Sequence, residues 1–287
     1  MFDAFILVFL NAFFWGSWPA ALKKARVEVR LKTAFLTFGV FFLSVFVFLF
    51  VSNSHFSLGD VLLAFASGVL WSFGAESFSK SVERIGMARS GAYVSPLIVV
   101  FSVAFGVLFF GEFFASGVSN FLQAVFGALL VSIGLFAVSL SERHAGDVQG
   151  FFHVFLAAFF WTLYAVPLKL ASAGNILVLL LPMSVGMIAG AWLPLLRFPK
   201  VAVSKRDFLA LFTGGAVWGA GNVINVFLIS SIGFAKALSA SQLAMLFAVA
   251  WGVFVFKEAA SRKQLLLLAG GSIVALAGVL LLLSSRT

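Results

Sequence analysis

Long apolar runs alternate with short polar segments along the whole chain. A helix needs about 20 mostly apolar residues to cross the ~30 Å hydrocarbon core of a bilayer. Runs of this kind lie at 3–22, 33–51, 61–79, 90–110, 120–140, 151–170, 176–196, 208–228, 238–256 and 264–283. They are apolar throughout, whereas strands of membrane barrels alternate apolar and polar residues. The pattern therefore predicts an all-α integral membrane protein with ten transmembrane helices.

The composition agrees with this interpretation. Hydrophobic residues make up 62% of the 287 residues and charged residues 10%, whereas a soluble domain has about 25% charged residues. The chain has no cysteine, which excludes disulfides, thiolate catalysis and cysteine-bound metals. It also lacks a phosphate-binding loop, a His-Glu-x-x-His helix and a nucleophile elbow. We therefore expect that the protein is not an enzyme and uses no cofactor or metal.

Basic residues are concentrated on one side of the predicted topology. The loops that follow spans one, three, five, seven and nine contain 16 of the 19 Lys and Arg residues. Positive charge marks cytoplasmic loops, so we predict a multi-pass protein of the cell membrane with both termini outside. These scattered loops account for the net charge of +9. They form no basic stripe of the kind that binds nucleic acid.

One motif occurs twice, about half a chain apart. Residues 12–23 read Ala-Phe-Phe-Trp-Gly-Ser-Trp-Pro-Ala-Ala-Leu-Lys, and residues 158–169 read Ala-Phe-Phe-Trp-Thr-Leu-Tyr-Ala-Val-Pro-Leu-Lys. The duplication divides the single membrane domain into two five-helix repeats, 1–144 and 145–287. Because five is an odd number of crossings, we expect the second repeat to be inverted. Membrane carriers of this construction bind their substrate between the halves.

Further matches occur in the same order, with offsets of 144 to 147 residues. They pair 71–74 with 218–221, 85–89 with 232–236, Gly106 and Glu112 with Gly252 and Glu258, and Gly127 and Gly134 with Gly271 and Gly278. We expect Glu112 and Glu258, which follow their spans, to cap a helix or to pair in a loop. Two glycine pairs at a spacing of four predict close helix packing, Gly186 with Gly190 and Gly215 with Gly219.

These features resemble the drug/metabolite transporter superfamily, which has a five-plus-five helix repeat and an acidic residue after spans four and nine. The second half is similar to the glucose/ribose porter branch at 218–222, Ile232-Gly233, Ser241-Gln242 and 251–258. The start Trp18-Pro19-Ala20 resembles the ureide-permease relatives of that branch. The first half departs, because Ser95-Pro96 stands where the second half has Ser241-Gln242. The resemblance implies bacterial uptake of a glucose-like or pentose sugar together with protons.

Three amides within apolar spans are the first group of candidate substrate-binding residues: Asn222, Asn225 and Gln242. Polar groups in lipid-embedded helices are costly unless they face a cavity or a partner. An amide offers both donors and acceptors, which suits the hydroxyls of a sugar or the amides of a ureide. Hydrogen bonding between helices is the alternative role for each amide.

Aromatic residues are the main part of the second group. Most of them lie well inside their spans, away from the ends where interfacial aromatics gather. A flat aromatic face stacks on a sugar ring, and an indole N–H donates a hydrogen bond. The candidates are Trp15, Ser17, Trp18, Trp71, Trp161, Tyr164 and Trp218. Ordinary packing is the alternative role of the aromatic side chains. Near two of them, Pro19 and Pro167 predict either a helix break whose freed carbonyl lines the site or a plain kink.

Glu76 is the candidate for proton coupling, because it lies within span three. A carboxylate in low-dielectric surroundings can take up and release a proton during transport. Lys80 follows four residues later, which is the spacing of a helical ion pair. A coupling role and a structural ion pair are therefore both open at this position.

Together these patterns predict a secondary active transporter that moves a small polar metabolite, foremost a sugar, by alternating access. The expected partners are a small-molecule substrate and membrane lipid. A monomer is sufficient, and a homodimer is compatible with the pattern. An exporter or permease for amino acids, ureides or nucleobases is the alternative, because helix number does not name a substrate. A membrane-embedded enzyme and a channel are the more distant alternatives.

Overall fold

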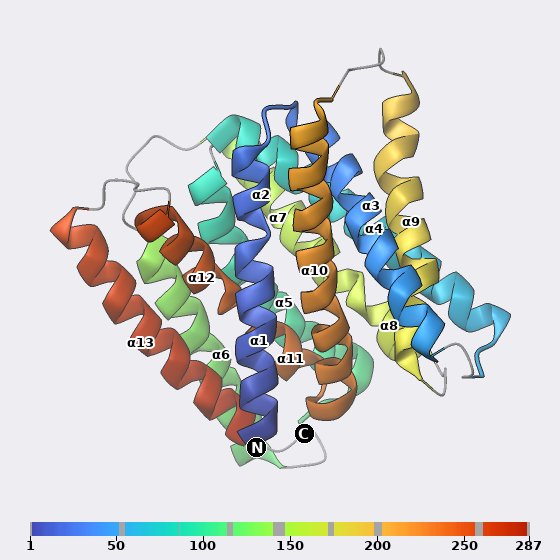
Figure 1. Cartoon of the computed structure of the whole chain (residues 1–287). Helices are drawn as coiled ribbons and strands as arrows, with labels where there is room; N and C mark the ends of the chain where they lie inside the picture. The colour runs from blue at the N-terminus through green and yellow to red at the C-terminus, as the bar shows by residue number, and fades with distance from the viewer. Residues whose placement is uncertain are drawn as a thin grey trace.

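The computed structural model of the chain is a bundle of helices (Figure 1). It describes residues 2–51, 55–85, 87–113, 117–139, 147–171, 175–197, 203–255 and 261–285. The spans are α1 (Phe2–Ser17) with α2 (Pro19–Lys24), α3 (Val29–Val51), α4 (Leu58–Ile85), α5 (Met87–Phe110), α6 (Val118–Ser139), α7 (Val148–Leu163) with α8 (Ala165–Leu170), η1 (Ile176–Leu179) with α9 (Leu180–Trp192) and η2 (Leu193–Arg197), α10 (Lys205–Ile232), α11 (Phe234–Ser241) with α12 (Ala244–Ala250) and η3 (Trp251–Val255), and α13 (Arg262–Ser284). The described residues contain no strand, which agrees with the all-α prediction.

Eight of the described helical segments are long and apolar enough to cross a membrane. Two shorter apolar helices, Phe234–Ala248 and Ala269–Ser284, stand at the ninth and tenth predicted spans. Large apolar side chains such as Phe42, Leu49 and Phe50 remain exposed on the surface of the bundle. Extensive exposed apolar surface of this kind marks contact with a membrane. The structure is therefore that of a multi-pass membrane protein.

Three spans are interrupted within the bundle. The first breaks at Trp18, directly before Pro19, and the sixth breaks at Tyr164, three residues before Pro167. Proline lacks an N–H and clashes with the carbonyl of the preceding turn, so the kinks predicted from the two prolines are confirmed as helix breaks. The third break separates α11 from α12 at Gln242 and has no proline.

Glycines bring neighbouring helices into backbone contact. Gly215 of α10 faces the carbonyl of Leu36 in α3, and Gly186 of α9 faces the carbonyl of Phe65 in α4. A β-carbon at either glycine would overlap the facing carbonyl oxygen. The close packing predicted from the glycine spacing is therefore confirmed at these two positions.

The helices α6 and α13 pack side by side at one edge of the bundle (Figure 1). Gly127 lies against the turn at Gly278, and Gly134 lies against the turn at Gly271. The two helices are antiparallel, because residue numbers rise along one helix as they fall along the other. In the middle of the bundle, α4 packs along α7 and α9, and α10 packs along α1 and α3.

Glu112 caps the N-terminus of α11. Its carboxylate accepts hydrogen bonds from the backbone N–H groups of Phe234, at 2.6 Å, and Ala235, at 2.9 Å. Gly233 joins α10 to α11 with a φ of 96°, a conformation that glycine adopts without steric cost. The predicted capping role of Glu112 is confirmed, whereas Glu258 lies outside the described residues.

The start of α1 and the end of α13 lie at the same end of the bundle (Figure 1). The opposite end, which we call the basic end, carries Lys23, Lys24, Arg26 and Arg84. There Asp147 caps α7 and accepts a hydrogen bond of 2.8 Å from Arg84 of α4. This bond is the main cause that lowers the pKa of the exposed Asp147 carboxyl, so the cap is charged at neutral pH.

Candidate functional site

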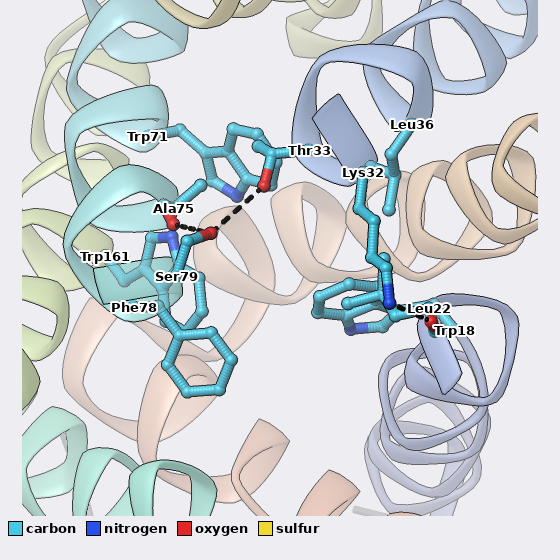
Figure 2. Close-up of a pocket in the computed structure, with 10 residues that line it drawn as sticks. All are labelled: Trp18, Leu22, Lys32, Thr33, Leu36, Trp71, Ala75, Phe78, Ser79 and Trp161. Carbon is cyan, nitrogen blue, oxygen red and sulfur yellow. Dashed lines mark hydrogen bonds between the residues drawn. The ribbon is translucent and has the colours of Figure 1, made fainter. Parts of the chain in front are cut away.

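A cavity of about 60 Å³ lies between the first span, α3, α4 and α7 (Figure 2). Its wall runs from Leu22, beside the lysines of the basic end, to Trp71 in the middle of α4. It is lined by Trp18, Leu22, Lys32, Thr33, Leu36, Trp71, Ala75, Phe78, Ser79 and Trp161. A site for one water needs about 10–15 Å³, so the cavity holds a few water molecules. Three of the predicted substrate-binding aromatics, Trp18, Trp71 and Trp161, form part of its wall.

The polar groups of the cavity lie on opposite walls. Lys32 stands beside Trp18 and donates to the backbone carbonyl of Leu22 at 2.8 Å (Figure 2). Across the cavity, the Ser79 hydroxyl lies 3.4 Å from the Thr33 hydroxyl. The Trp161 indole N–H is buried and has no acceptor among the described residues. The wall is therefore mostly aromatic and apolar, with the Lys32 ammonium and the Thr33 and Ser79 hydroxyls as its polar groups.

Tryptophans lie at the inner end of the cavity, in the middle of the bundle, and form what we call the tryptophan floor. Trp71 of α4 packs against Trp218 of α10 with ring centroids 5.0 Å apart. Trp15 of α1 stacks on the other side of this pair, 6.0 Å from Trp218 and at an interplanar angle of 10°. The Trp15 indole N–H donates to the Trp218 backbone carbonyl at 3.3 Å. Together with Trp161 of the cavity wall, these three tryptophans lie at or beside the tryptophan floor.

Beyond the tryptophans lies a buried polar cluster. The Tyr164 hydroxyl donates to Asn222 Oδ1 at 3.3 Å, and Asn222 Nδ2 lies 3.6 Å from Met183 Sδ. Asn225, one turn along α10, is fully buried, and neither of its polar atoms has a hydrogen-bond partner among the described residues. Asn11 of α1 donates to the carbonyl of Gly221 at 2.7 Å. Tyr164, Asn222 and Asn225 were all predicted from the sequence as substrate-binding residues, and in the structure they lie next to one another.

Two predicted site residues lie elsewhere. Ser17 donates to the Phe13 carbonyl at 2.6 Å and accepts from the Trp251 indole at 2.9 Å, so it joins the first span to the ninth. Gln242 stands at the break in the ninth span, and its amide donates to the Leu238 carbonyl at 3.3 Å. Neither side chain lines the cavity described above.

The proton-coupling candidate forms an ion pair. The Glu76 carboxylate lies 2.7 Å from the Lys80 ammonium, and both side chains are about one-third exposed, at 37% and 36%. Glu76 follows Ala75, a wall residue, but does not itself line the cavity. The predicted helical pairing is therefore present in this conformation.

Four polar residues of the site were missed by sequence reasoning: Asn11, Lys32, Thr33 and Ser79. Asn11 met the criterion applied to Asn222, a polar residue inside an apolar run, and could have been found by it. Lys32 and Thr33 open the second span, where loop and membrane composition overlap. Ser79 is one of several small hydroxyl residues along α4, so only the packing of α4 against α3 singles it out.

The apolar spans define this chain as a multi-pass membrane protein, and its helices enclose a cavity. The family model described as sugar transport protein matches residues 6–284. The chain belongs to this family.

Several curated proteins are similar over nearly their whole length. The glucose uptake protein GlcU of Bacillus subtilis is 24% identical, with 98% of each chain covered. A protein of Listeria monocytogenes named for sugar uptake is 25% identical over 96% of this chain and 97% of its own. Another such protein, from Enterococcus faecalis, is 26% identical over 93% and 94%. One crystal structure superposes with a TM-score of 0.69 at 17% identity, over 95% of this chain and 96% of that chain, which shows a shared fold.

Proposed function

We propose that the protein is a secondary carrier that takes up a sugar by alternating access. The observation that carries this proposal is the tryptophan-lined cavity that reaches the middle of the bundle in a member of the sugar transport protein family. Indole faces stack on the apolar face of a sugar ring and their N–H groups donate to its hydroxyls. The names of the relatives, glucose uptake and sugar uptake, point to the same substrate class.

The packing of the helices supports two inverted five-helix repeats. Between the two repeats α4 corresponds to α10, α7 to α1 and α9 to α3. The contacts of α4 with α7 and α9 therefore have their equivalents in the contacts of α10 with α1 and α3. The counterparts Trp15 and Trp161 pack in the same way, against Gly221 and Gly74. The antiparallel pair α6 and α13 is its own counterpart, as a two-fold axis in the membrane plane requires.

The cavity volume supports a conformational cycle. About 60 Å³ holds a few water molecules, but a sugar ring needs more room, so the walls have to move apart to admit it. The cavity approaches the basic end, which we assign to the cytoplasm from the distribution of Lys and Arg. We therefore assign this conformation as close to the state in which the cavity faces the cytoplasm. The same assignment places both termini outside the cell.

Uptake by the purified protein in liposomes tests the proposal. Radiolabelled glucose, a pentose, a ureide, a nucleobase and an amino acid are each offered with and without an imposed proton gradient. We expect accumulation of a sugar that saturates with concentration and requires the gradient. Movement of another metabolite without movement of any sugar would contradict the proposed substrate, and flux that never saturates would indicate a channel.

We further propose that Glu76 carries the coupled proton. The other acidic side chains that the structure describes lie in loops or at helix ends: Glu28, Asp60, Glu112, Asp147 and Asp207. Glu76 alone among the described acids lies in mid-helix next to the cavity wall. The Glu76 carboxylate remains partly exposed although it is paired with Lys80, so a proton can reach this carboxylate.

Glu76→Gln is expected to abolish uphill sugar uptake and to leave exchange of labelled for unlabelled sugar at the wild-type rate, because only the proton step is lost. Both rates are measured in the same liposomes. Lys80→Met is the matched control, since it breaks the same ion pair without removing the carboxylate. Equal loss of uptake and exchange in both variants, with lower yield, would instead identify a structural ion pair.

A further inference from the structure

The residues that line the cavity have counterparts in the second half. Trp18 and Leu22 correspond to Tyr164 and Leu168, 146 residues later. At an offset of 147 residues, Leu36 corresponds to Met183 and Ala75 to Asn222. Phe78 corresponds to Asn225 and Trp71 to Trp218 at the same offset. We call Tyr164, Leu168, Met183, Trp218, Asn222 and Asn225 the closed counterpart.

The closed counterpart is packed shut. Each of its six residues is at most 5% exposed. On the cavity side Leu22, Leu36, Trp71 and Ala75 are buried too, and the two halves differ at Trp18 and Phe78, which remain half-buried. The closed counterpart runs from the central tryptophans toward the end of the bundle that carries the termini, because Leu168 lies in the last turn of α8 and Asn225 lies about two turns before the end of α10 on that side.

The tryptophan hydrogen bonds differ between the two sides in the same sense. On the closed side the Trp15 indole donates to the Trp218 carbonyl at 3.3 Å. Its counterpart Trp161 lines the open cavity, where its indole N–H has no acceptor among the described residues. The Trp161 ring instead packs against Phe78 at 5.0 Å. On the closed side the indole N–H therefore donates to a backbone carbonyl, whereas on the cavity side it is buried without an acceptor among the described residues.

Asn225 is the polar side chain of the closed counterpart whose hydrogen-bonding capacity the fold leaves largely unused. It interacts with the Tyr164 hydroxyl, but that hydroxyl donates to Asn222, and neither Asn225 polar atom has a hydrogen bond of good geometry to the described residues. A buried amide whose hydrogen bonds are not made destabilises the fold. This penalty disappears in a conformation where water or a ligand reaches the Asn225 amide.

We propose that the closed counterpart is the second mouth of the transport path and that Asn225 binds the hydroxyls of the sugar when this mouth opens. The identity of the substrate, a sugar, is taken from the proposed function. The positions of the residues in the second mouth follow from the two-fold relation between the halves. Both mouths end at the same tryptophan floor, so we expect the helices that carry these tryptophans to close one mouth as they open the other. The two mouths differ chemically, since asparagines occupy positions that hold Ala75 and Phe78 in the first half.

Accessibility of introduced cysteines tests the second mouth. The chain has no cysteine of its own, so single variants need no altered background. Leu180 is buried and corresponds to the cavity residue Thr33 at an offset of 147 residues. Leu168→Cys and Leu180→Cys are treated with a charged, membrane-impermeant thiol reagent from each side of oriented vesicles. We expect labelling from the side of the termini, and labelling of Leu22→Cys from the basic end. Val131→Cys, buried between α6 and α13, is the unlabelled control.

The inference is overturned if Leu168→Cys and Leu180→Cys react no faster than Val131→Cys while Leu22→Cys reacts. Thermal unfolding of each variant in detergent verifies that it is folded. Labelling does not depend on the substrate. A second mouth that opens in a protein that moves no sugar would therefore refute the proposed function and leave the second mouth standing.

Asn225→Leu tests the binding role. We expect sugar uptake to fall about tenfold or more, the loss of one to two hydrogen bonds to the ligand, with an unchanged or higher unfolding temperature. Asn225→Ala is the second variant, with the same expected loss of uptake. Asn175→Leu is the matched control, because Asn175 caps η1 through its side chain, so unfolding temperature falls while uptake per folded molecule stays constant. Wild-type uptake in both Asn225 variants would overturn the role of Asn225.

Discussion

Glu112→Ala is expected to lower the free energy of unfolding by about 3 kcal/mol or more, because two charge-assisted hydrogen bonds of about 1.5–3 kcal/mol each are lost. The variant leaves the N–H groups of Phe234 and Ala235, both buried at the start of α11, without their acceptor. Denaturation of the purified protein in detergent, followed by circular dichroism, measures the change.

Two control variants define the origin of this loss. Glu112→Gln keeps one carbonyl acceptor and should lose only part of the stability. Glu28→Ala removes an exposed acid and should stay within about 0.5 kcal/mol of the wild type. A Glu112→Ala protein as stable as the wild type would show that the ninth span does not depend on its cap.

Gly39→Ala is expected to destabilise the bundle by about 3 kcal/mol, the upper part of the range for overpacked sites. A β-carbon at Gly39 meets the carbonyl of Phe212 and lies 2.7 Å from the Ala216 nitrogen. Both are backbone atoms of α10, so no side chain can rotate away and the two helices have to separate. The yield of monodisperse protein and its unfolding temperature report the effect.

Gly270→Ala is the matched control for Gly39→Ala. Gly270 lies in α13, and a β-carbon there meets nothing within 4 Å. The substitution should therefore stabilise the helix by up to about 1 kcal/mol, since alanine is the better helix former. If both variants behaved alike, helix propensity rather than the contact of α3 with α10 would decide stability.

The helices were predictable because each apolar run has to satisfy its backbone inside lipid, and a helix does so with local hydrogen bonds alone. The breaks at Trp18 and Tyr164 were predictable for an equally local reason, the prolines that follow. The break at Gln242 was not. No proline marks it, and the two pieces α11 and α12 are held by contacts with α1 and α5, which are remote in sequence.

The candidate site was predictable in its residue types more than in its shape. Tryptophans, a tyrosine and asparagines inside apolar runs pointed to the middle of the bundle, and the structure brings eight of them into one region with Trp71 and Trp218 at its centre. Ser17 and Gln242 have the same polar character in the sequence. Their partners Trp251 and Leu238 are set by packing, which the pattern along the chain does not contain.

Ten apolar runs, a duplicated motif and a charge asymmetry can be read directly from the chain, because each follows from local composition and spacing. The packing of the helices, in contrast, is what makes the copy around Trp18 and Phe78 enclose a cavity while the copy around Tyr164 and Asn225 is shut. Two packings of one chain can differ by only a few kcal/mol. The balance between them is a sum over many remote contacts, and no single stretch of residues records it.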